Sequence, residues 1–463
     1  MEKQLPKNWI ECTMNELAEI TAGIGFPNHL QGNLNGEIPF YKVGDISQSI
    51  LRNEIYLNNA NNYISEEVRK ELKGKLFPKG TLVFAKIGEA LRLNRRAIIS
   101  KPSLCDNNVM GIIPNHMEMY KLIYYYFCTL DLGDFSAGNS IPSIRKSSVL
   151  GIPFPLPPLA EQNRLVTKLD KLFTQLEIIK TSMANIPLLL KDFRQQVLTQ
   201  AVTGKLTEEW RKGKELVNDY NDRIININKR KSNINLPKNW LDLSFDSVVN
   251  IKSNLVPPND YLEYPLITPD VIQSETGTLL SKPLVSDIMP ISAKHYFSKG
   301  DIVYSKIRPY LSKLIITDFD GLCSADMYPL STDLNVKFLF YFMLSSEFLI
   351  HATTAGERSV LPKINQKGLN IIPIPTPSLK EQGEIVSRVE SLFVKADAIE
   401  QQYKSLKDKI DNLPQALLHK AFKGELTEQL ESDGDAKELL RQIQELKNKT
   451  TKSKRNQSPT YEN

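Results

Sequence analysis

Cysteine is scarce in this chain, and its few cysteines are widely separated. Of the 463 residues only four are cysteines: Cys12, Cys105, Cys128 and Cys323. No two of them have the C-x-x-C spacing of zinc sites or redox motifs, and they build no disulfide framework. The sequence therefore excludes a small disulfide-bonded secreted fold and fits a reducing compartment.

Long apolar runs are also missing. The most apolar stretches, residues 122–130 and 338–344, are much shorter than the roughly 20 residues that span a bilayer. The opening residues, MEKQLPKNW, are polar where a secretory signal peptide has an apolar core. The composition, 41% hydrophobic and 24% charged, is typical of a globular protein, so we expect a cytoplasmic protein without membrane segments.

Catalytic motifs are missing as well. The chain has no G-x-x-x-x-G-K-[ST] phosphate-binding loop, and its nearest approach to a methyltransferase N/D-P-P-aromatic loop, residues 257–261, has the wrong residue order. Asp270 and Glu275 lack the E-x-K or D-x-K partner of a nuclease carboxylate pair. The histidines form no spaced metal-binding pair: His29, His116, His295, His351 and His419. We therefore predict no catalytic residue, no metal site and no cofactor held by this chain.

The net charge is small, but the basic residues are unevenly distributed. Lysine and arginine number 58 against 53 acidic residues, which gives +5 and by itself indicates no partner. Residues 79–101 contain six basic residues against Glu89 alone, and residues 294–313 contain five against Asp301 alone. Such clusters suit neutralisation of nucleic-acid phosphates, whereas the alternative interpretation is a solvated loop.

The most informative feature is an internal repeat. The stretch IPFPLPPLAEQNRLVTKLDKLFTQLEIIK at 152–180 returns at 372–400 as IPIPTPSLKEQGEIVSRVESLFVKADAIE, with eleven of 29 positions identical and no gap. LPKNW occurs at both 5–9 and 236–240. The chain therefore consists of two halves that share one frame.

Each copy of the repeat predicts a long helix. Apolar residues recur in alternating steps of four and three, the a/d spacing of a coiled coil. The seam begins with Leu165, Leu169, Leu172, Leu176 and Ile179 in the first copy, and with Ile385, Val389, Leu392, Ala396 and Ile399 in the second. Pro187 lacks an amide hydrogen, so we expect a kink there in the first helix.

The order of the segments predicts how the two helices pair. Each globular segment precedes its helix, so antiparallel pairing gives the duplicated chain a pseudo-two-fold axis, and we expect that pairing. The fold class is α+β: two mixed α/β domains separated by two long helices that form an antiparallel intramolecular coiled coil. The expected segments are domain 1 at 1–158, helix 1 at 159–208, a linker at 209–235, domain 2 at 236–378, helix 2 at 379–431, and a tail at 432–463 that is largely disordered towards its end.

The basic residues recur at matching places in the two domains. FPKGTLVFAKIG at 77–88 aligns with FSKGDIVYSKIR at 297–308, so Lys86 and Lys306 stand at the ends of corresponding strands. Lysine and arginine neutralise phosphates, and arginine and asparagine also read base edges. The candidate DNA contacts are Lys42, Lys86, Arg92, Arg95, Arg96, Arg145 and Lys146 in domain 1, and Lys306, Arg308, Tyr310, Lys313, Arg358, Lys363 and Asn365 in domain 2.

In combination, these repeated elements resemble the specificity subunits of type I restriction-modification systems. The resemblance rests on the paired LPKNW, the IP-x-P-x-P-x-L-x-EQ helix entries, and AVTGKLTEEW with AFKGELTEQL. It implies two target-recognition domains that each read half of an interrupted, asymmetric site in double-stranded DNA. It also implies spacer helices that bind two modification (methyltransferase) subunits, and restriction (translocase/nuclease) subunits in the same complex. AdoMet, ATP and Mg²⁺ would then be ligands of those partners.

Two other interpretations remain open on the sequence. A purely structural coiled-coil scaffold would make the basic loops incidental, so that neutralising them would leave DNA binding unchanged. An enzyme with an unfamiliar site would transfer methyl groups or cleave DNA as an isolated chain.

Overall fold

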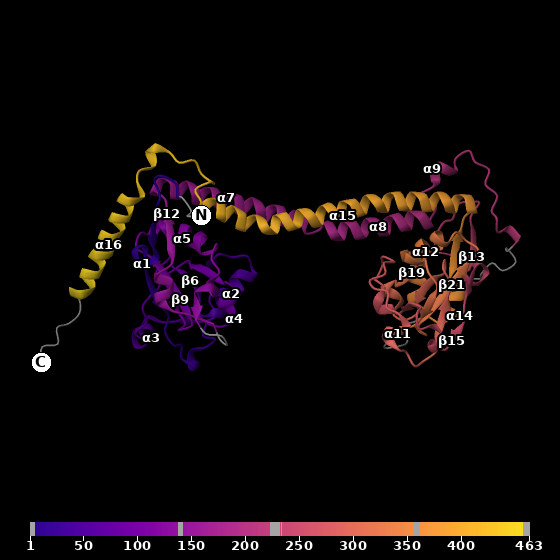
Figure 1. The fold of residues 1–463 in the computed structure, drawn as a ribbon, viewed down its shortest axis with the longest axis horizontal. Helices are drawn as coiled ribbons and strands as arrows, with labels where there is room; N and C mark the ends of the chain where they lie inside the picture. The colour runs from indigo at the N-terminus through magenta and orange to yellow at the C-terminus, as the bar shows by residue number, and fades with distance from the viewer. Residues whose placement is uncertain (1–4, 138–141, 223–231, 233, 355–361, 457–463) are drawn as a thin grey trace. The chain divides into compact units, whose positions relative to one another are not determined.

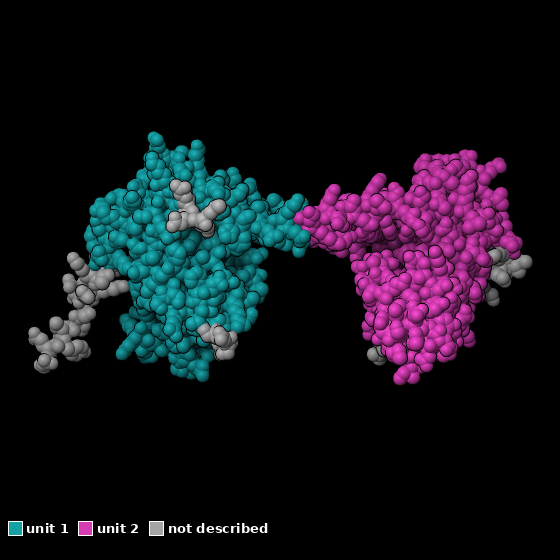
Figure 2. Space-filling model, in the orientation of Figure 1, with its two compact units in different colours: residues 1–182, 406–463 teal, residues 183–405 magenta. Residues whose placement is uncertain are grey.

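The computed structural model describes residues 5–137, 142–222, 232, 234–354 and 362–456. They fall into two compact units, which Figure 2 colours separately: unit 1 comprises Met1–Ser182 with Leu406–Asn463, and unit 2 comprises Met183–Ser405. Each unit therefore holds one globular domain and a segment of each long helical region. The six expected segments are thus grouped into two units that both draw on both halves of the chain.

The globular domain of unit 1 is built on a five-stranded sheet of order β2-β9-β6-β7-β4, in which only β4 pairs in parallel. Its strands are β2 (Ala18–Ala22), β4 (Tyr56–Leu57), β6 (Leu82–Ala85), β7 (Arg96–Ile99) and β9 (Val109–Pro114). A three-stranded sheet and two further strand pairs complete it: β5 (Tyr63–Ile64), β3 (Ile38–Tyr41) and β8 (Leu104–Cys105); β1 (Ile10–Thr13) with β12 (Pro153–Leu156); β10 (Ser136–Ala137) with β11 (Ser143–Ile144). The helices are α1 (Met14–Leu17), α2 (Val43–Leu51), α3 (Glu66–Glu71), α4 (Glu89–Arg92), α5 (Tyr120–Phe127) and α6 (Lys146–Leu150) (Figure 1).

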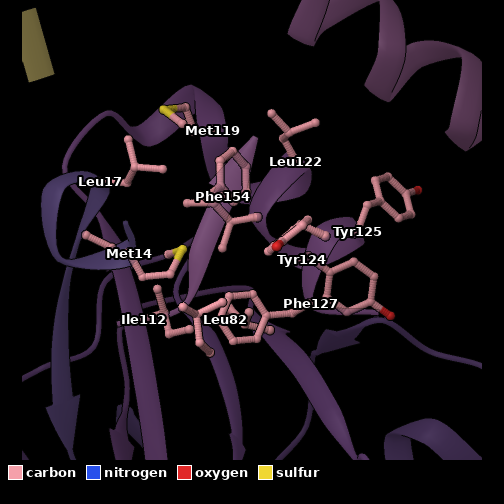
Figure 3. Close-up of a cluster of buried hydrophobic side chains, with 14 of the residues drawn as sticks. Met14, Leu17, Leu82, Ile112, Met119, Leu122, Tyr124, Tyr125, Phe127 and Phe154 are labelled. Atoms are coloured by element: carbon pink, nitrogen blue, oxygen red, sulfur yellow. The ribbon is translucent and has the colours of Figure 1, made fainter. Parts of the chain in front are cut away.

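Both faces of this sheet are covered, which explains why β6 reads as an unbroken apolar run, LVFA. Side chains alternate along a strand, so Leu82 and Phe84 enter one core while Val83 enters another. Figure 3 shows the first of these cores, where Leu82 and Ile112 of the sheet lie near Phe127 of α5. A strand buried on both faces leaves only its end free to carry polar function.

The globular domain of unit 2 repeats this plan. The sheet β14-β21-β18-β19 is antiparallel throughout and has the same strand order as β2-β9-β6-β7. Its strands are β14 (Val249–Ile251), β21 (Met327–Thr332), β18 (Ile302–Ser305) and β19 (Leu314–Ile316); beside it lie β15 (Leu255–Val256), β17 (Lys294–Phe297), β20 (Gly321–Cys323) and β16 (Leu266–Ile267), and β13 (Leu241–Ser244) with β22 (Pro373–Thr376). The helices are α10 (Phe245–Val248), α11 (Val285–Ile288), α12 (Val336–Leu344), α13 (Ser346–Thr354) and α14 (Gln366–Asn370). The prediction of two repeated mixed domains is confirmed.

The long helices pair antiparallel within each unit. In unit 1 the start of α7 (Leu159–Met183) shares a core with the end of α15 (Leu379–Phe422), through Leu165 and Leu169 against Leu418. In unit 2 the end of α8 (Ile186–Val202) shares a core with the start of α15, through Val197 against Ile385. The predicted antiparallel pairing is confirmed.

Only part of the predicted seam is buried. Six of its residues are buried: Leu165, Leu169, Leu176, Ile385, Val389 and Ala396. Leu172 and Leu392 are half-buried, and the prediction is wrong for Ile179 and Ile399, which are 45% and 50% exposed. Two helices cover only a narrow stripe of each other, and the globular domains supply the third layer near the outer ends.

Pro187 breaks the first helix rather than kinking it. The helix α7 ends at Met183, two turn residues follow, and α8 begins at Ile186 with Pro187 in its first turn, where an amide hydrogen has no partner. The expectation of one helix at 159–208 is therefore wrong. Pro414, by contrast, lies inside α15 without interrupting it. The expected ends at 208 and 431 were also too late, because the helices end at Val202 and Phe422.

The C-terminal tail is more ordered than expected. The helix α16 extends over Ala436–Asn456, and Leu439, Leu440 and Ile443 join the core of unit 1. The predicted disorder towards the end of the tail at 432–463 is therefore wrong through residue 456, and 457–463 lie outside the described residues. In the linker, α9 (Glu208–Arg211) is helical and Tyr220 is buried. Across the described residues, every helix is too short or too polar to cross a bilayer.

A buried carboxylate joins the repeated motifs in each unit. In unit 1, Glu161 Oε2 accepts from Trp9 Nε1 at 2.8 Å and Oε1 accepts from Thr427 Oγ1 at 3.0 Å. In unit 2 the matching carboxylate belongs to Glu381. It accepts from three side chains: Trp240 Nε1 at 3.0 Å, Thr207 Oγ1 at 2.7 Å and Arg211 Nη1 at 2.5 Å. LPKNW, the helix start and the G-x-L-T turn are thus one structural element.

This element predicts a large loss of stability on Glu381→Ala. The substitution leaves the indole N–H of Trp240 and the Arg211 guanidinium without their buried acceptor, so we expect unit 2 to lose about 3–5 kcal/mol of unfolding free energy. Denaturant unfolding measures this loss. As control, Glu384→Gln removes a more exposed pair with Arg388 on the same helix and should cost less than about 1 kcal/mol. Equal unfolding midpoints for the two variants would contradict the assignment.

Candidate nucleic-acid interface

The two strand-end lysines lie at equivalent places. Lys86 directly follows β6, its N–H donates to Asn108 O at 2.9 Å, and its carbonyl accepts from Ile144 N at 2.9 Å. Lys306 follows β18, donates to Asp326 O at 3.0 Å, and accepts from Ile364 N at 2.9 Å. The backbone thereby brings each lysine beside the segment that leads into α6 or α14.

That neighbouring segment carries several of the other predicted contacts. Arg145 and Lys146 are exposed at the start of α6, and Lys363 and Asn365 are exposed just before α14. Asn365 also has a structural role, because its side-chain oxygen accepts from Gly368 N at 2.8 Å and caps α14. The structure therefore gathers in each unit a strand end and a short helix start, both bearing polar or basic side chains.

Positive charge is concentrated at the unit 2 site. Lys306 Nζ donates to Ala325 O at 2.5 Å and lies 4.9 Å from the ring centroid of Tyr328. Partial burial and the charge of Lys363 lower the pKa of Lys306, although the nearby Asp326 opposes this. Lys363 Nζ lies 2.9 Å from Asp326 Oδ1. A bound anion would favour the charged form of Lys306, so the site is suited to phosphate.

Of the four remaining predicted contacts of the second domain, the structure describes three, which lie in different surroundings. Arg308 and Tyr310 are exposed, on the turn that follows Lys306. Lys313 is half-buried, and its Nζ donates to Pro269 O at 2.6 Å, which ties it to the protein backbone. Arg358 lies outside the described residues.

Arg96 is not a surface contact, so that prediction is wrong. It lies in β7, is 5% exposed, and donates from Nε to Asn94 O at 2.9 Å and from Nη2 to Leu130 O at 3.2 Å. Burial lowers the pKa of its guanidinium. Both faces of β7 are buried, so a side chain on this strand is covered on whichever face it lies. Its neighbours Arg92 and Arg95 remain available, the first exposed and the second half-buried.

Unit 1 also contains a polar pocket that charge counting missed. It has a volume of about 350 Å³ and is lined by Lys42, Val43, Gly44, Asp45, Asn61, Asn62, Asp106 and Asn108. Asp45 Oδ1 accepts from Asn61 Nδ2 at 2.8 Å, and Asn108, whose carbonyl accepts from Lys86 N, joins the pocket to the strand end. The asparagine-rich run LNNANNY at 57–63 was the available signal. Within the described ranges, no group of three or more histidine, cysteine, aspartate or glutamate side chains could hold a metal.

Comparison with known proteins identifies the protein family of this chain. Residues 6–188 and 237–408, more than half of the chain, match the family described as Type I restriction modification DNA specificity domain. The chain belongs to this family. The resemblance in the repeated motifs is thereby confirmed, and each matched range lies within one half of the chain.

Individual relatives agree with this assignment. Over 294 residues, 63% of this chain and 66% of the other, the chain is 45% identical to the Type I restriction enzyme EcoDI specificity subunit of Escherichia coli. That alignment spans slightly less than two thirds of the relative. The EcoBI specificity subunit of Escherichia coli is 27% identical over 446 residues, 91% of this chain and 87% of that one.

Solved structures share the fold. The HsdS subunit from Thermoanaerobacter tengcongensis matches with a TM-score of 0.59 at 17% identity, covering 92% of this chain and 99% of that one. A chain from a structure concerned with complex assembly and conformational transition of the type I R-M system matches with a TM-score of 0.60 at 17% identity, covering 91% and 100%. At this identity the likeness concerns the fold.

The strand-end lysines yield a direct prediction for DNA binding. We expect Lys86→Ala and Lys306→Ala each to weaken binding and to reduce the slope of log K against log salt by about one, because each lysine would neutralise one phosphate. Titrations at several salt concentrations measure both quantities. Lys75→Ala and Lys337→Ala are matched controls, because these lysines pair with Glu19 and Glu390 elsewhere on the surface. Unchanged affinity and slope in both test variants would remove these lysines as contacts.

Proposed function

We propose that this chain is the DNA sequence-specificity subunit of a type I restriction-modification complex. Each globular domain reads one half of an interrupted DNA site. The observation that carries the proposal is the repeated arrangement of Lys86 with Arg145 and of Lys306 with Asn365, set on one frame with different intervening loops. Shared frames with unlike loops suit unlike half-sites, so the full site is asymmetric.

In this proposal the chain positions DNA while its partners carry out the chemistry. Two modification subunits bind along the helical region, and restriction subunits join the same complex. AdoMet, ATP and Mg²⁺ are then ligands of those partners. Membership of a DNA specificity family supports this division of labour.

Methylome sequencing tests the proposal in cells that express this chain with its modification partner. We expect one bipartite methylated motif. Replacing residues 236–371 with the corresponding module of a relative should change one half of that motif and leave the other intact, because the domains have separate cores. Simultaneous change of both halves would contradict independent reading. Absence of any bipartite motif would contradict the proposal itself.

The helices in this proposal set the gap between the half-sites. Removing Ala184–Leu190, which include the two-residue break before α8, together with Gln402–Asp408 of α15 deletes seven residues from each long helical region. The deletion keeps the alternating four- and three-residue steps of the seam. In sequence, both deleted segments lie between residues of two interhelical ion pairs. These pairs are Lys180 with Asp411 in unit 1 and Arg194 with Asp397 in unit 2. In the described part of the chain, neither segment makes a hydrogen bond or ion pair with a globular domain.

The deletion shortens the helices by about 10 Å, so we expect the preferred gap to shrink by about three base pairs. Those base pairs also carry about 100° of DNA twist, at roughly 10.5 base pairs per turn, which weakens binding to any fixed site. Selection from DNA with randomised spacer lengths is therefore the suitable measurement. A folded, DNA-binding variant that selects the original gap would exclude the spacing role.

A further inference from the structure

The turns that follow Lys86 and Lys306 each begin with a residue of positive φ that is hydrogen-bonded to the same neighbouring segment. Gly88 has φ +75° and donates its N–H to Pro142 O at 2.9 Å. Arg308 has φ +48° and donates its N–H to Pro362 O at 2.8 Å. The two residues therefore occupy one structural position, which is a glycine in unit 1 and an arginine in unit 2.

An arginine is an unfavourable choice at this position. Left-handed φ values bring Cβ close to the backbone, a cost that glycine avoids. Pro309 adds a second penalty, because a residue before proline favours extended conformations and Arg308 has ψ 61°. The surroundings nevertheless impose the turn, since Leu311 N donates to Arg308 O at 2.9 Å and Ser312 N to Pro309 O at 3.0 Å. Strain held in this way is typical of functional sites.

The Arg308 side chain does not stabilise the fold in return. It is exposed, and it makes no hydrogen bond or ion pair with any residue in the ranges that the structure describes. At the matching Gly88, a Cβ would meet no atom within 4 Å. The position therefore opens onto free space, next to the basic pair formed by Lys306 and Lys363.

The chemistry of this arrangement favours a base edge over a phosphate. Lys306 and Lys363 already supply two positive point charges, which suffice for phosphate contacts. A guanidinium offers two parallel donors, and its commonest specific DNA partner is the O6 and N7 edge of guanine. To hydrogen-bond that edge, the side chain must extend from a backbone position that is held in place. The left-handed turn between β18 and β19 provides one.

We propose that Arg308 is a specificity-determining residue that reads a guanine in the half-site of unit 2. The inference rests on the proposed function and adds to it the residue and the base. Unit 1 has no side chain at the matching position, so its half-site is read from other residues.

The test is selection from DNA randomised in both half-sites, using the assembled complex with wild-type chain, Arg308→Gly or Arg308→Lys. We expect Arg308→Gly to lose a preference for guanine at one position, by roughly 5- to 150-fold, and to leave the unit 1 half-site unchanged. Arg308→Lys should show the same loss with an unchanged salt slope, because it keeps the charge and loses the two-donor geometry. Lys363→Ala is the comparison variant. Because a phosphate contact carries no base preference, its loss should weaken binding to all DNA sequences alike.

Stability provides a second readout. Arg308→Gly installs the residue that unit 1 already uses, so the variant should unfold at an equal or higher denaturant concentration than the wild type. An unchanged half-site in Arg308→Gly, or uniform weakening with a salt slope reduced by about one, overturns the inference alone. A wild-type complex that selects no bipartite site overturns the inference and the proposed function together.

Discussion

The architecture depends on two buried carboxylates, Glu161 and Glu381. Each is fully buried in the first turn of a long helix, and a buried charge is tolerated only when its hydrogen bonds are satisfied. The helix N-terminus helps through its positive end. The remaining partners come from LPKNW, from the G-x-L-T turn and, for Glu381, also from Arg211 of α9. Three segments far apart in sequence must therefore meet at one point in each unit, and this fixes where the domain joins its helix.

This meeting point also explains why each unit uses both halves of the chain. Glu161 in the first half bonds Thr427 from the second, and Glu381 in the second half bonds Thr207 from the first. The turns before these threonines need glycine. Gly204 and Gly424 have φ +74° and +73°, and an added Cβ would lie 2.7 Å from Pro237 Cγ and 2.3 Å from Pro6 Cγ. The prolines of both LPKNW motifs thus pack against the ends of the opposite helices, as antiparallel pairing requires.

Sequence periodicity predicted the helices well because a/d spacing is a local property, and direction followed from segment order. Periodicity could not show which seam residues are covered by a neighbouring element. Ile179 and Ile399 were therefore assigned to the buried seam, although both are exposed in the structure. The count of basic residues likewise included Arg96, which is buried because its strand is covered on both faces. From the sequence, Pro187 and Pro414 are both expected to disturb a helix, because proline has no amide hydrogen. They differ in the structure because Ile410 and Leu418, on either side of Pro414, are both buried and hold α15 together. The tail was misjudged from its polar end, although Leu439, Leu440 and Ile443 have helical spacing.

The candidate site shows how one frame can carry different recognition surfaces. The turns after β6 and β18 are both bounded by residues of positive φ: Gly88 and Asn94 in unit 1, and Arg308 and Ser312 in unit 2. The two ends of such a loop are fixed by backbone conformation and by hydrogen bonds to the neighbouring segment. Its exposed side chains therefore contribute little to the stability of the loop. Those side chains can then differ without disturbing the sheet: unit 1 fits the helix α4 between the two ends, and unit 2 fits a 3₁₀ turn at Pro309–Leu311. Stability thus resides in the buried strands and the glutamate-centred junctions, and recognition is left to the strand ends.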